Sequence, residues 1–267
     1  MTDFSSTVRS PAPGLTKVGQ LFFAIATVAF GILNFIYGDF VMGRAPVWPE
    51  LVGGKYVWAY ASGSIFICSG VAMAAGIKPR LATLVVAILV LIWALMRHVF
   101  ALNFQWGAEI TWFGKALFLC GGAFAVAGSF PKESGSIANK FPGFINATSL
   151  FIYIGRFAMG IFLIICGIEH FMFVDFVKSL VPAWIPGQTF WTYFAGVALI
   201  AGGAGLMINP VARLAAILSG LMVFVWFIIL HIPRAVVSAG DGNEWISVFE
   251  ALAVSGICFV SSSLRQN

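Results

Sequence analysis

Ionisable side chains interrupt the long apolar stretches in the second half of this 267-residue chain. His170, His231, Arg234 and Glu250 each lie at or near the end of such a stretch. An ionisable residue inside a bilayer costs about 2.5–3.5 kcal/mol on insertion scales, so each needs a partner, a water-filled cavity or an escape to the interface. Histidine and arginine donate hydrogen bonds and a carboxyl group exchanges protons, which is the chemistry that a quinone headgroup requires.

The spacing of these residues predicts which of them share a helix face. Cys166 and His170 are four residues apart, and His231 and Arg234 are three apart, so each pair faces one side of its helix. Glu169 points about 100° away from His170. The sequence therefore predicts a quinone site formed by His170, His231 and Arg234, with Glu250 as the proton carrier.

Each of these residues also has a structural interpretation. Glu250 could be a neutral proton carrier, or it could be structural in a tight pair with Lys115, Arg234 or a histidine. The histidines could form interhelical hydrogen bonds without catalysis, while Lys115 and Arg97 could extend to the interface. Two histidines could also bind haem or a metal ion, but no further ligands accompany them, so we expect neither.

The composition defines the environment in which this chemistry would occur. The chain is 60% hydrophobic and 9% charged, against roughly 45–50% and 25% in soluble globular proteins. This predicts an integral membrane protein and disfavours soluble enzymes, disulfide scaffolds and nucleic-acid binders. The net charge of +5 then belongs to loops that orient helices. All four cysteines lie in apolar stretches without zinc-site spacing and are interpreted as core residues.

Eight stretches are long enough to cross about 30 Å of hydrocarbon as helices. Their length and continuity favour helices over barrel strands, which predicts an all-α polytopic protein. The predicted spans are residues 18–37, 57–77, 81–102, 110–130, 149–174, 190–208, 211–232 and 245–260.

The chain also resembles itself, which predicts a tandem duplication of a four-helix unit. The predicted units are residues 1–131 and 148–267, joined by a cytoplasmic linker at 132–147. Matched residues include Gly19/Gly155, Gly31/Gly167, Gly63/Gly196, Trp93/Trp226 and His98/His231. The register of the first spans places Asn34 opposite His170, and laying residues 115–117 (KAL) on 250–252 (EAL) places Lys115 opposite Glu250.

The duplication and the charge distribution together predict the topology. Four spans per unit is an even number, so both units enter the membrane from the same side as parallel repeats. Nine of the 15 Lys and Arg residues lie in the terminal segments and in the connections on their side of the membrane. The excess of positive charge predicts that both termini are cytoplasmic. The segments around Pro46, Pro49, Pro182 and Pro186 are too rich in proline for continued helix and are placed in the outer interface.

Several motifs of the second half resemble the DoxX family of bacterial four-helix membrane proteins. They are residues 167–171 (GIEHF), 181–186 (VPAWIP), 231–234 (HIPR), 243–245 (NEW) and 249–252 (FEAL). The resemblance implies a four-helix bundle per repeat, a bacterial plasma membrane and a link to respiratory or redox-stress systems. The first repeat departs from these motifs, with Asn34 and Lys115 at the positions of His170 and Glu250, so activity is expected in the second.

Three functional hypotheses follow. In the first, the protein is a quinone-interacting subunit of a respiratory or redox-stress system, with a soluble or membrane oxidoreductase as its partner. In the second, it is a noncatalytic membrane anchor for a soluble enzyme. In the third, it transports protons or a small solute. The absence of a haem-attachment motif, a dinucleotide glycine motif and long loops disfavours autonomous electron transfer from a soluble donor.

Overall fold

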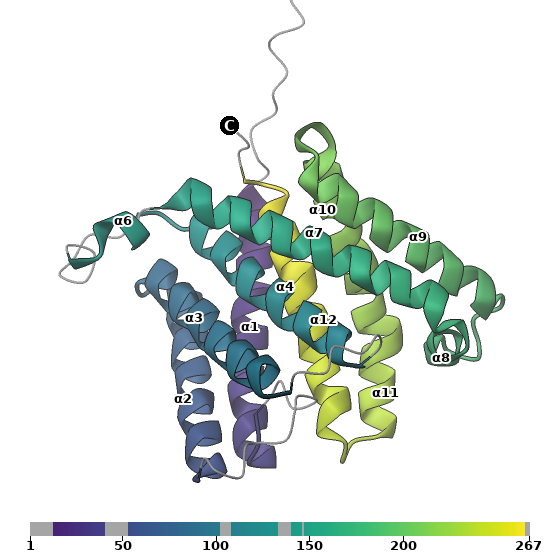
Figure 1. Ribbon diagram of the computed structural model, residues 1–267, viewed down its shortest axis with the longest axis horizontal. Coiled ribbons are helices and arrows are strands. Elements are labelled where there is room, and N and C mark those ends of the chain that lie inside the picture. The colour runs from purple at the N-terminus through teal and green to yellow at the C-terminus, as the bar shows by residue number, and fades with distance from the viewer. Residues whose placement is uncertain (1–12, 41–52, 102–107, 133–139, 146, 265–267) are drawn as a thin grey trace, which may run out of the picture.

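The computed structural model describes residues 13–40, 53–101, 108–132, 140–145 and 147–264, and the described chain is helical without strands (Figure 1). The helices are α1 (Pro13–Tyr37), α2 (Lys55–Ala74), α3 (Pro79–Ala101), α4 (Ala108–Ser129), α6 (Pro142–Ile145), α7 (Thr148–Met172), α8 (Val174–Leu180), α9 (Gln188–Met207), α10 (Asn209–Trp226), the π-helix η1 (Phe227–His231), α11 (Ile232–Val237) and α12 (Gly242–Ser261).

Eight of the described helical segments are long and apolar enough to span a membrane, which confirms the predicted all-α polytopic class. Two boundaries differ from the prediction. The seventh span continues beyond residue 232 and runs from Asn209 to Val237. The fifth ends at Met172, and the short helix α8 follows before the chain becomes non-helical between Leu180 and Gln188. That segment contains Pro182 and Pro186, as the proline argument predicted.

The seventh span passes a proline by widening its turn. Pro233 has no N–H group, and its ring would collide with the carbonyl four residues earlier in a regular α-helix. The chain instead forms η1, in which the Ile232 N–H donates to the Phe227 carbonyl five residues back. This arrangement carries the helix through the proline and places His231 in the widened turn. Single π-turns of this kind occur frequently at functional sites.

The first helix of each predicted repeat packs against two partners. Helix α1 packs against α2 of its own repeat and against α12 of the other, while α7 packs against α9 and α4 (Figure 1). Helices α4 and α12 also contact each other. These two helices are the most enclosed spans: 67% and 72% of their most apolar 18-residue stretches are buried, whereas the corresponding stretch between Asn209 and Val237 has 22%. The two repeats are therefore interlocked, and the predicted division at residues 131 and 148 stays a prediction about sequence units.

Glycines at matched positions create these close helix contacts. A Cβ atom on Gly19 would collide with the Gly256 carbonyl oxygen, and one on Gly155 would lie 2.5 Å from the Gly121 carbonyl oxygen. Gly19 matches Gly155 in the predicted duplication. Gly121 matches Gly256 when Lys115 is aligned with Glu250. The contact of α1 with α12 is therefore repeated in the contact of α7 with α4. Small residues allow backbones to approach closely, and van der Waals packing drives helix association in lipid.

Apolar side chains cover the outer surfaces of the helices. Examples that are about half exposed are Leu21, Leu95, Leu150, Val197 and Leu218. A soluble monomer rarely exposes so much contiguous apolar surface, whereas the hydrocarbon of a bilayer covers it without cost. The protein is therefore a multi-pass membrane protein whose outward faces contact lipid.

Two arginines on the side of the chain termini are buried and cap helix ends. Arg80 is 0% exposed, its Nη1 donates to the Phe130 carbonyl at 3.2 Å, and its guanidinium lies over the Phe151 ring. Arg156 donates to the Leu206 carbonyl through Nε and Nη2 at 3.0 and 2.7 Å. Cations at helix C-termini satisfy the last carbonyls and the helix dipole. Both arginines therefore stabilise helix ends inside the protein, and both also belong to the excess of positive charge that predicts the topology.

Replacing Gly203 with leucine is expected to destabilise the protein. A Cβ at this position would lie 2.9 Å from the Ile164 side chain and 2.5 Å from the Gly160 carbonyl oxygen, so α7 and α9 would have to separate. Overpacking of this kind typically costs about 1–3 kcal/mol. The melting temperature in detergent measures the effect. Gly14→Leu is the control, because a Cβ there meets nothing within 4 Å, and equal melting temperatures for the two variants would contradict close α7–α9 packing.

Candidate functional site

The central polar contact joins the two repeats. The Lys115 ammonium on α4 donates to Glu250 Oε2 on α12 at 2.5 Å. Their side chains are 25% and 12% exposed, so the pair is largely enclosed although water or headgroups can reach the lysine. The pair lies at matched positions of the two repeats, where α4 and α12 meet. Among the partners that sequence left open for Glu250, the structure thus selects Lys115.

A second polar contact lies on the same face of α4, one turn nearer its start. The Thr111 hydroxyl donates to both carboxylate oxygens of Glu169 on α7, at 2.6 and 2.7 Å. Glu169 is only 8% exposed. We call Thr111, Lys115, Glu169 and Glu250 the inter-repeat cluster; it forms where α4 meets α7 and α12.

Two contacts determine the position of His170. Its Nδ1 lies 2.7 Å from the Cys166 carbonyl oxygen, and its ring stacks on Trp226 with centroids 6.2 Å apart and planes inclined by 20°. A carbonyl only accepts hydrogen bonds, so Nδ1 must carry the proton. In the neutral ring this leaves Nε2 as an acceptor. The position and the tautomer of His170 are therefore both determined by its surroundings.

His231 and Arg234 lie on the segment that passes Pro233. His231 is the last residue of η1 and is partly buried, and η1 packs against α12. Arg234 on α11 donates from Nη2 to Glu244 Oε1 at 2.6 Å, which joins α11 to the first turn of α12. Glu244 also suits this helix N-terminus, where negative charge is favourable.

The predicted site residues therefore have three different partners in the structure. Glu250 pairs with Lys115, Arg234 with Glu244, and His170 with the Cys166 carbonyl. The side chains of Arg97 and His98 lie outside the described residues. Among the residues described, no group of three or more His, Cys, Asp or Glu side chains is arranged to hold a metal ion.

Glu169 is the residue that sequence reasoning left out of the site. The predicted direction of Glu169, away from His170, is confirmed. Glu169 faces α4, whereas His170 contacts Trp226 of α10. Two spacings in the sequence could have indicated this site. Cys166 and Glu169 are three residues apart and Thr111 and Lys115 are four apart, so each pair lies on one face of its helix. Which helices face each other was not predictable from either spacing alone.

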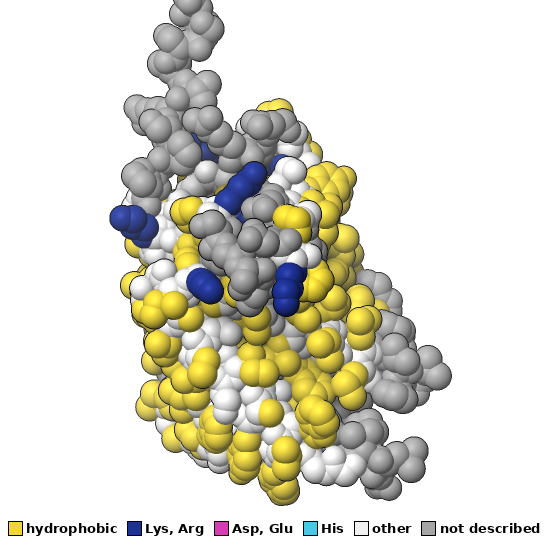
Figure 2. Space-filling view, turned by 90° about the vertical axis from the view of Figure 1, so that its left-hand side faces the viewer, with side chains coloured by type: hydrophobic (Ala, Val, Ile, Leu, Met, Phe, Trp, Pro, Cys, Tyr) yellow, Lys and Arg dark blue, Asp and Glu magenta, His cyan; other side chains and the backbone are white. Residues whose placement is uncertain are grey.

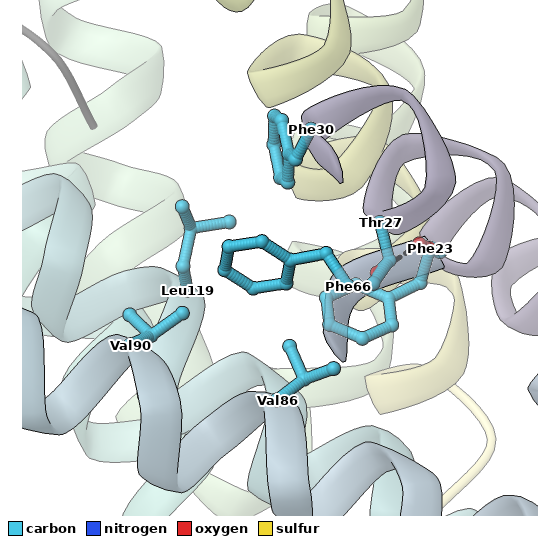
Figure 3. A pocket seen from close by; sticks show the side chains of 7 residues that line it. All are labelled: Phe23, Thr27, Phe30, Phe66, Val86, Val90 and Leu119. Atoms are coloured by element: carbon cyan, nitrogen blue, oxygen red, sulfur yellow. Dashed lines mark hydrogen bonds between the residues drawn. The ribbon is translucent and has the colours of Figure 1, made fainter. Parts of the chain in front are cut away.

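A small cavity lies inside the first repeat, between α1, α2, α3 and α4 (Figure 3). Its volume is about 10 Å³, which is the space of one water molecule. The Thr27 hydroxyl in its wall donates to the Phe23 carbonyl at 2.7 Å, so the wall offers little polar chemistry. This cavity is too small for a quinone ring. The lining side chains are Phe23, Thr27, Phe30, Phe66, Val86, Val90 and Leu119.

Comparison with known proteins gives one partial match. A family model described as a domain of unknown function (DUF8561) matches residues 159–254, which extends from α7 into α12 and includes every predicted site residue. No curated protein matches the chain. No solved structure matches it either.

Breaking the Lys115–Glu250 pair from one side is expected to destabilise the protein more than removing both charges. Lys115→Met and Glu250→Gln should each cost about 1–3 kcal/mol, below the roughly 3–5 kcal/mol of fully buried pairs, because Lys115 is partly exposed. The double variant should cost less than the sum of the two single changes. Unfolding in detergent measures all three.

The control for this cycle is Lys178→Met, which breaks the ion pair of Lys178 with Asp175 on α8. There the Lys178 hydrogen bond and charge hold the pKa of the exposed Asp175 carboxyl below its usual value, outside the membrane spans. Solvent screens that pair, so no measurable loss of stability is expected. Strict additivity of Lys115→Met and Glu250→Gln would contradict a coupled pair.

Proposed function

We propose that this membrane protein is a quinone-interacting subunit of a bacterial respiratory or redox-stress system. The observation that carries the proposal is the fixation of His170. Its Nδ1–H is bound to the Cys166 carbonyl and its ring is stacked on Trp226, so Nε2 is presented in one position beside an indole ring. A positioned acceptor beside an aromatic surface suits the hydroxyl of a flat, reduced quinone ring.

Arg234 and His231 supply the remaining polar contacts in this proposal. The described contact of Arg234 uses one N–H of Nη2, and a guanidinium has five N–H donors. Its bond to Glu244 therefore orients the group and leaves donors for a ring carbonyl. His231 lies in the π-turn just before Arg234, so both residues approach the headgroup from the same segment.

Glu250 has a different role from that of an isolated proton carrier. Since it pairs with Lys115, the group available for proton exchange is the pair rather than a lone carboxyl. A proton that leaves or enters this pair changes the net charge of the contact between α4 and α12. In the proposed function, the first repeat thus contributes Lys115 to the proton chemistry of the second.

The second candidate function is a noncatalytic anchor for a soluble enzyme. The observation that favours it is that Glu250 and Arg234, two of the proposed site residues, are engaged in ion pairs within the protein. Such pairs are sufficient to hold helices together without any ligand. If the protein is an anchor, it should be stable and should assemble without binding quinone. Quinone binding therefore distinguishes the two candidate functions.

We place the protein in the bacterial plasma membrane with both termini in the cytoplasm, in accord with the motifs that resemble DoxX. On the face shown in Figure 2, Lys and Arg side chains gather toward the end of the molecule where the C-terminus lies, and apolar side chains cover much of the rest. Basic residues are retained on the cytoplasmic side of membrane proteins.

A reporter fused after Asn267 tests this orientation. Because an excess of Lys and Arg accompanies the termini, we expect the fusion to be fluorescent as a cytoplasmic protein and inactive as alkaline phosphatase. A second fusion within the α11–α12 connection, after Gly240, is expected to give the opposite result. Active phosphatase at Asn267 would invert the topology.

The quinone site is tested by titrating the purified protein with ubiquinone and menaquinone analogues. Loss of a buried hydrogen-bond donor costs about 1–3 kcal/mol, so His231→Ala should weaken binding roughly five- to 150-fold while the protein stays folded. His98→Ala is the matched control from the first repeat, which lacks counterparts of Arg234 and the acid, and should change the affinity little. A wild-type protein that binds no analogue would leave the anchor as the function.

A further inference from the structure

The first repeat contains a buried amide whose oxygen has no partner among the residues that the structure describes. Asn34 on α1 is 1% exposed, and its Nδ2 donates to the Ala59 carbonyl on α2 at 3.1 Å. That bond fixes the orientation of the amide, because a carbonyl cannot donate. Oδ1 is thereby directed elsewhere, and it is buried without a hydrogen bond. A buried acceptor of this kind typically costs about 1–3 kcal/mol when it is left unsatisfied.

The surroundings of Asn34 match those of His170 in the second repeat. A Cβ on Gly63 would lie 3.1 Å from Asn34 Cβ, and one on the matching Gly196 would lie 3.0 Å from His170 Cβ. The neighbouring rings correspond as well: Phe35 stacks on Tyr60 at 5.2 Å, and Phe171 lies 5.6 Å from Tyr193. The two side chains therefore occupy equivalent places in the two bundles.

The two residues also leave the same kind of atom available. His170 donates through Nδ1 to a backbone carbonyl and keeps Nε2 as an acceptor, while Asn34 donates through Nδ2 to a backbone carbonyl and keeps Oδ1. An acceptor binds an O–H or N–H group and rejects a bare carbonyl oxygen. The shared chemistry of the two positions is therefore acceptance of a hydrogen bond from a donor.

Two further side chains complete the surroundings in the first repeat. Ser62, next to Gly63 on α2, is 2% exposed and accepts a hydrogen bond from Trp93 Nε1 at 3.1 Å, so its hydroxyl keeps one hydrogen to donate. One turn deeper along α1 and α2, Phe30 and Phe66 line the cavity of about 10 Å³ (Figure 3). A group that donates to an acceptor such as Asn34 Oδ1 and also accepts from a hydroxyl such as that of Ser62 must itself be a hydroxyl or a water molecule.

We propose that Asn34 Oδ1, with the Ser62 hydroxyl on the neighbouring helix, holds a single water molecule inside the first repeat, at the place that His170 occupies in the second. The adjoining cavity of about 10 Å³ has room for one water molecule and not for a quinone ring. This proposal does not rest on the quinone function, because Asn34 Oδ1 requires a donor whether or not the second repeat binds quinone.

The test is a structure of the full-length wild-type protein that resolves ordered water. We expect a peak about 3 Å from Asn34 Oδ1 and within hydrogen-bond distance of Ser62. A wild-type map with no peak within about 3.5 Å of Oδ1 overturns the proposal.

Two variants give an independent readout. Asn34→Leu removes the acceptor, and if a water molecule satisfies it in the wild type, the melting temperature should fall by on the order of 5 °C. Ser62→Ala copies Ala195 of the second repeat and leaves the Asn34–Ala59 bond in place, so it should weaken or remove the peak while the chain stays folded. An Asn34→Leu protein that melts at or above the wild-type temperature contradicts the proposal.

Discussion

A charged group inside a membrane is stabilised by a partner of opposite charge, and for Glu250 that partner lies in the other repeat. Lys115 on α4 and Glu250 on α12 meet at 2.5 Å where these two helices touch. The pair requires each repeat to contribute its fourth helix to the centre of the molecule. The packing of α1 on α12 and of α7 on α4 is the geometry that places them there. The glycine contacts between Gly19 and Gly256 and between Gly121 and Gly155 make the same geometry sterically possible.

The difference between the repeats at this position gives the contact its specificity. The two residues occupy matched positions, so a repeat paired with a copy of itself would oppose lysine to lysine or glutamate to glutamate. Like charges at such a distance repel, whereas the pair of unlike repeats attracts. In the predicted duplication, the charge difference at this one position favours contact between two different units over contact between two identical units.

The spans were predictable from sequence because their signal is local. Apolar length, proline positions and the matched glycines are read along the chain, and the eight spans followed from them. The partners of polar side chains were less accessible, because they depend on which helices face each other. Glu169 shows this: its direction relative to His170 was predicted, but its contact with Thr111 required α4 and α7 of different repeats to be neighbours. The partner of Arg234 was also not predictable. Glu244 is close to Arg234 in sequence, but the two side chains meet because the chain continues as helix through Pro233.

His170 and Asn34 illustrate how one position can keep its place while its chemistry changes. Both donate to a backbone carbonyl and both present an acceptor, but an imidazole can take up a proton near neutral pH and an amide cannot. In the proposed function, the second repeat is therefore the one that exchanges protons. The first repeat supplies the lysine that the acid of the second repeat contacts.

The most direct test of this account is a distance measurement between the two central side chains. Solid-state NMR can record the dipolar coupling between the Lys115 side-chain nitrogen and the Glu250 carboxylate carbon in lipid bilayers, with Lys115→Met to assign the signal. The account predicts a strong coupling, consistent with the nitrogen–oxygen contact of 2.5 Å. If the lysine nitrogen instead shows no coupling to any glutamate carboxylate in the wild-type protein, the two repeats do not meet through this pair and the account is contradicted.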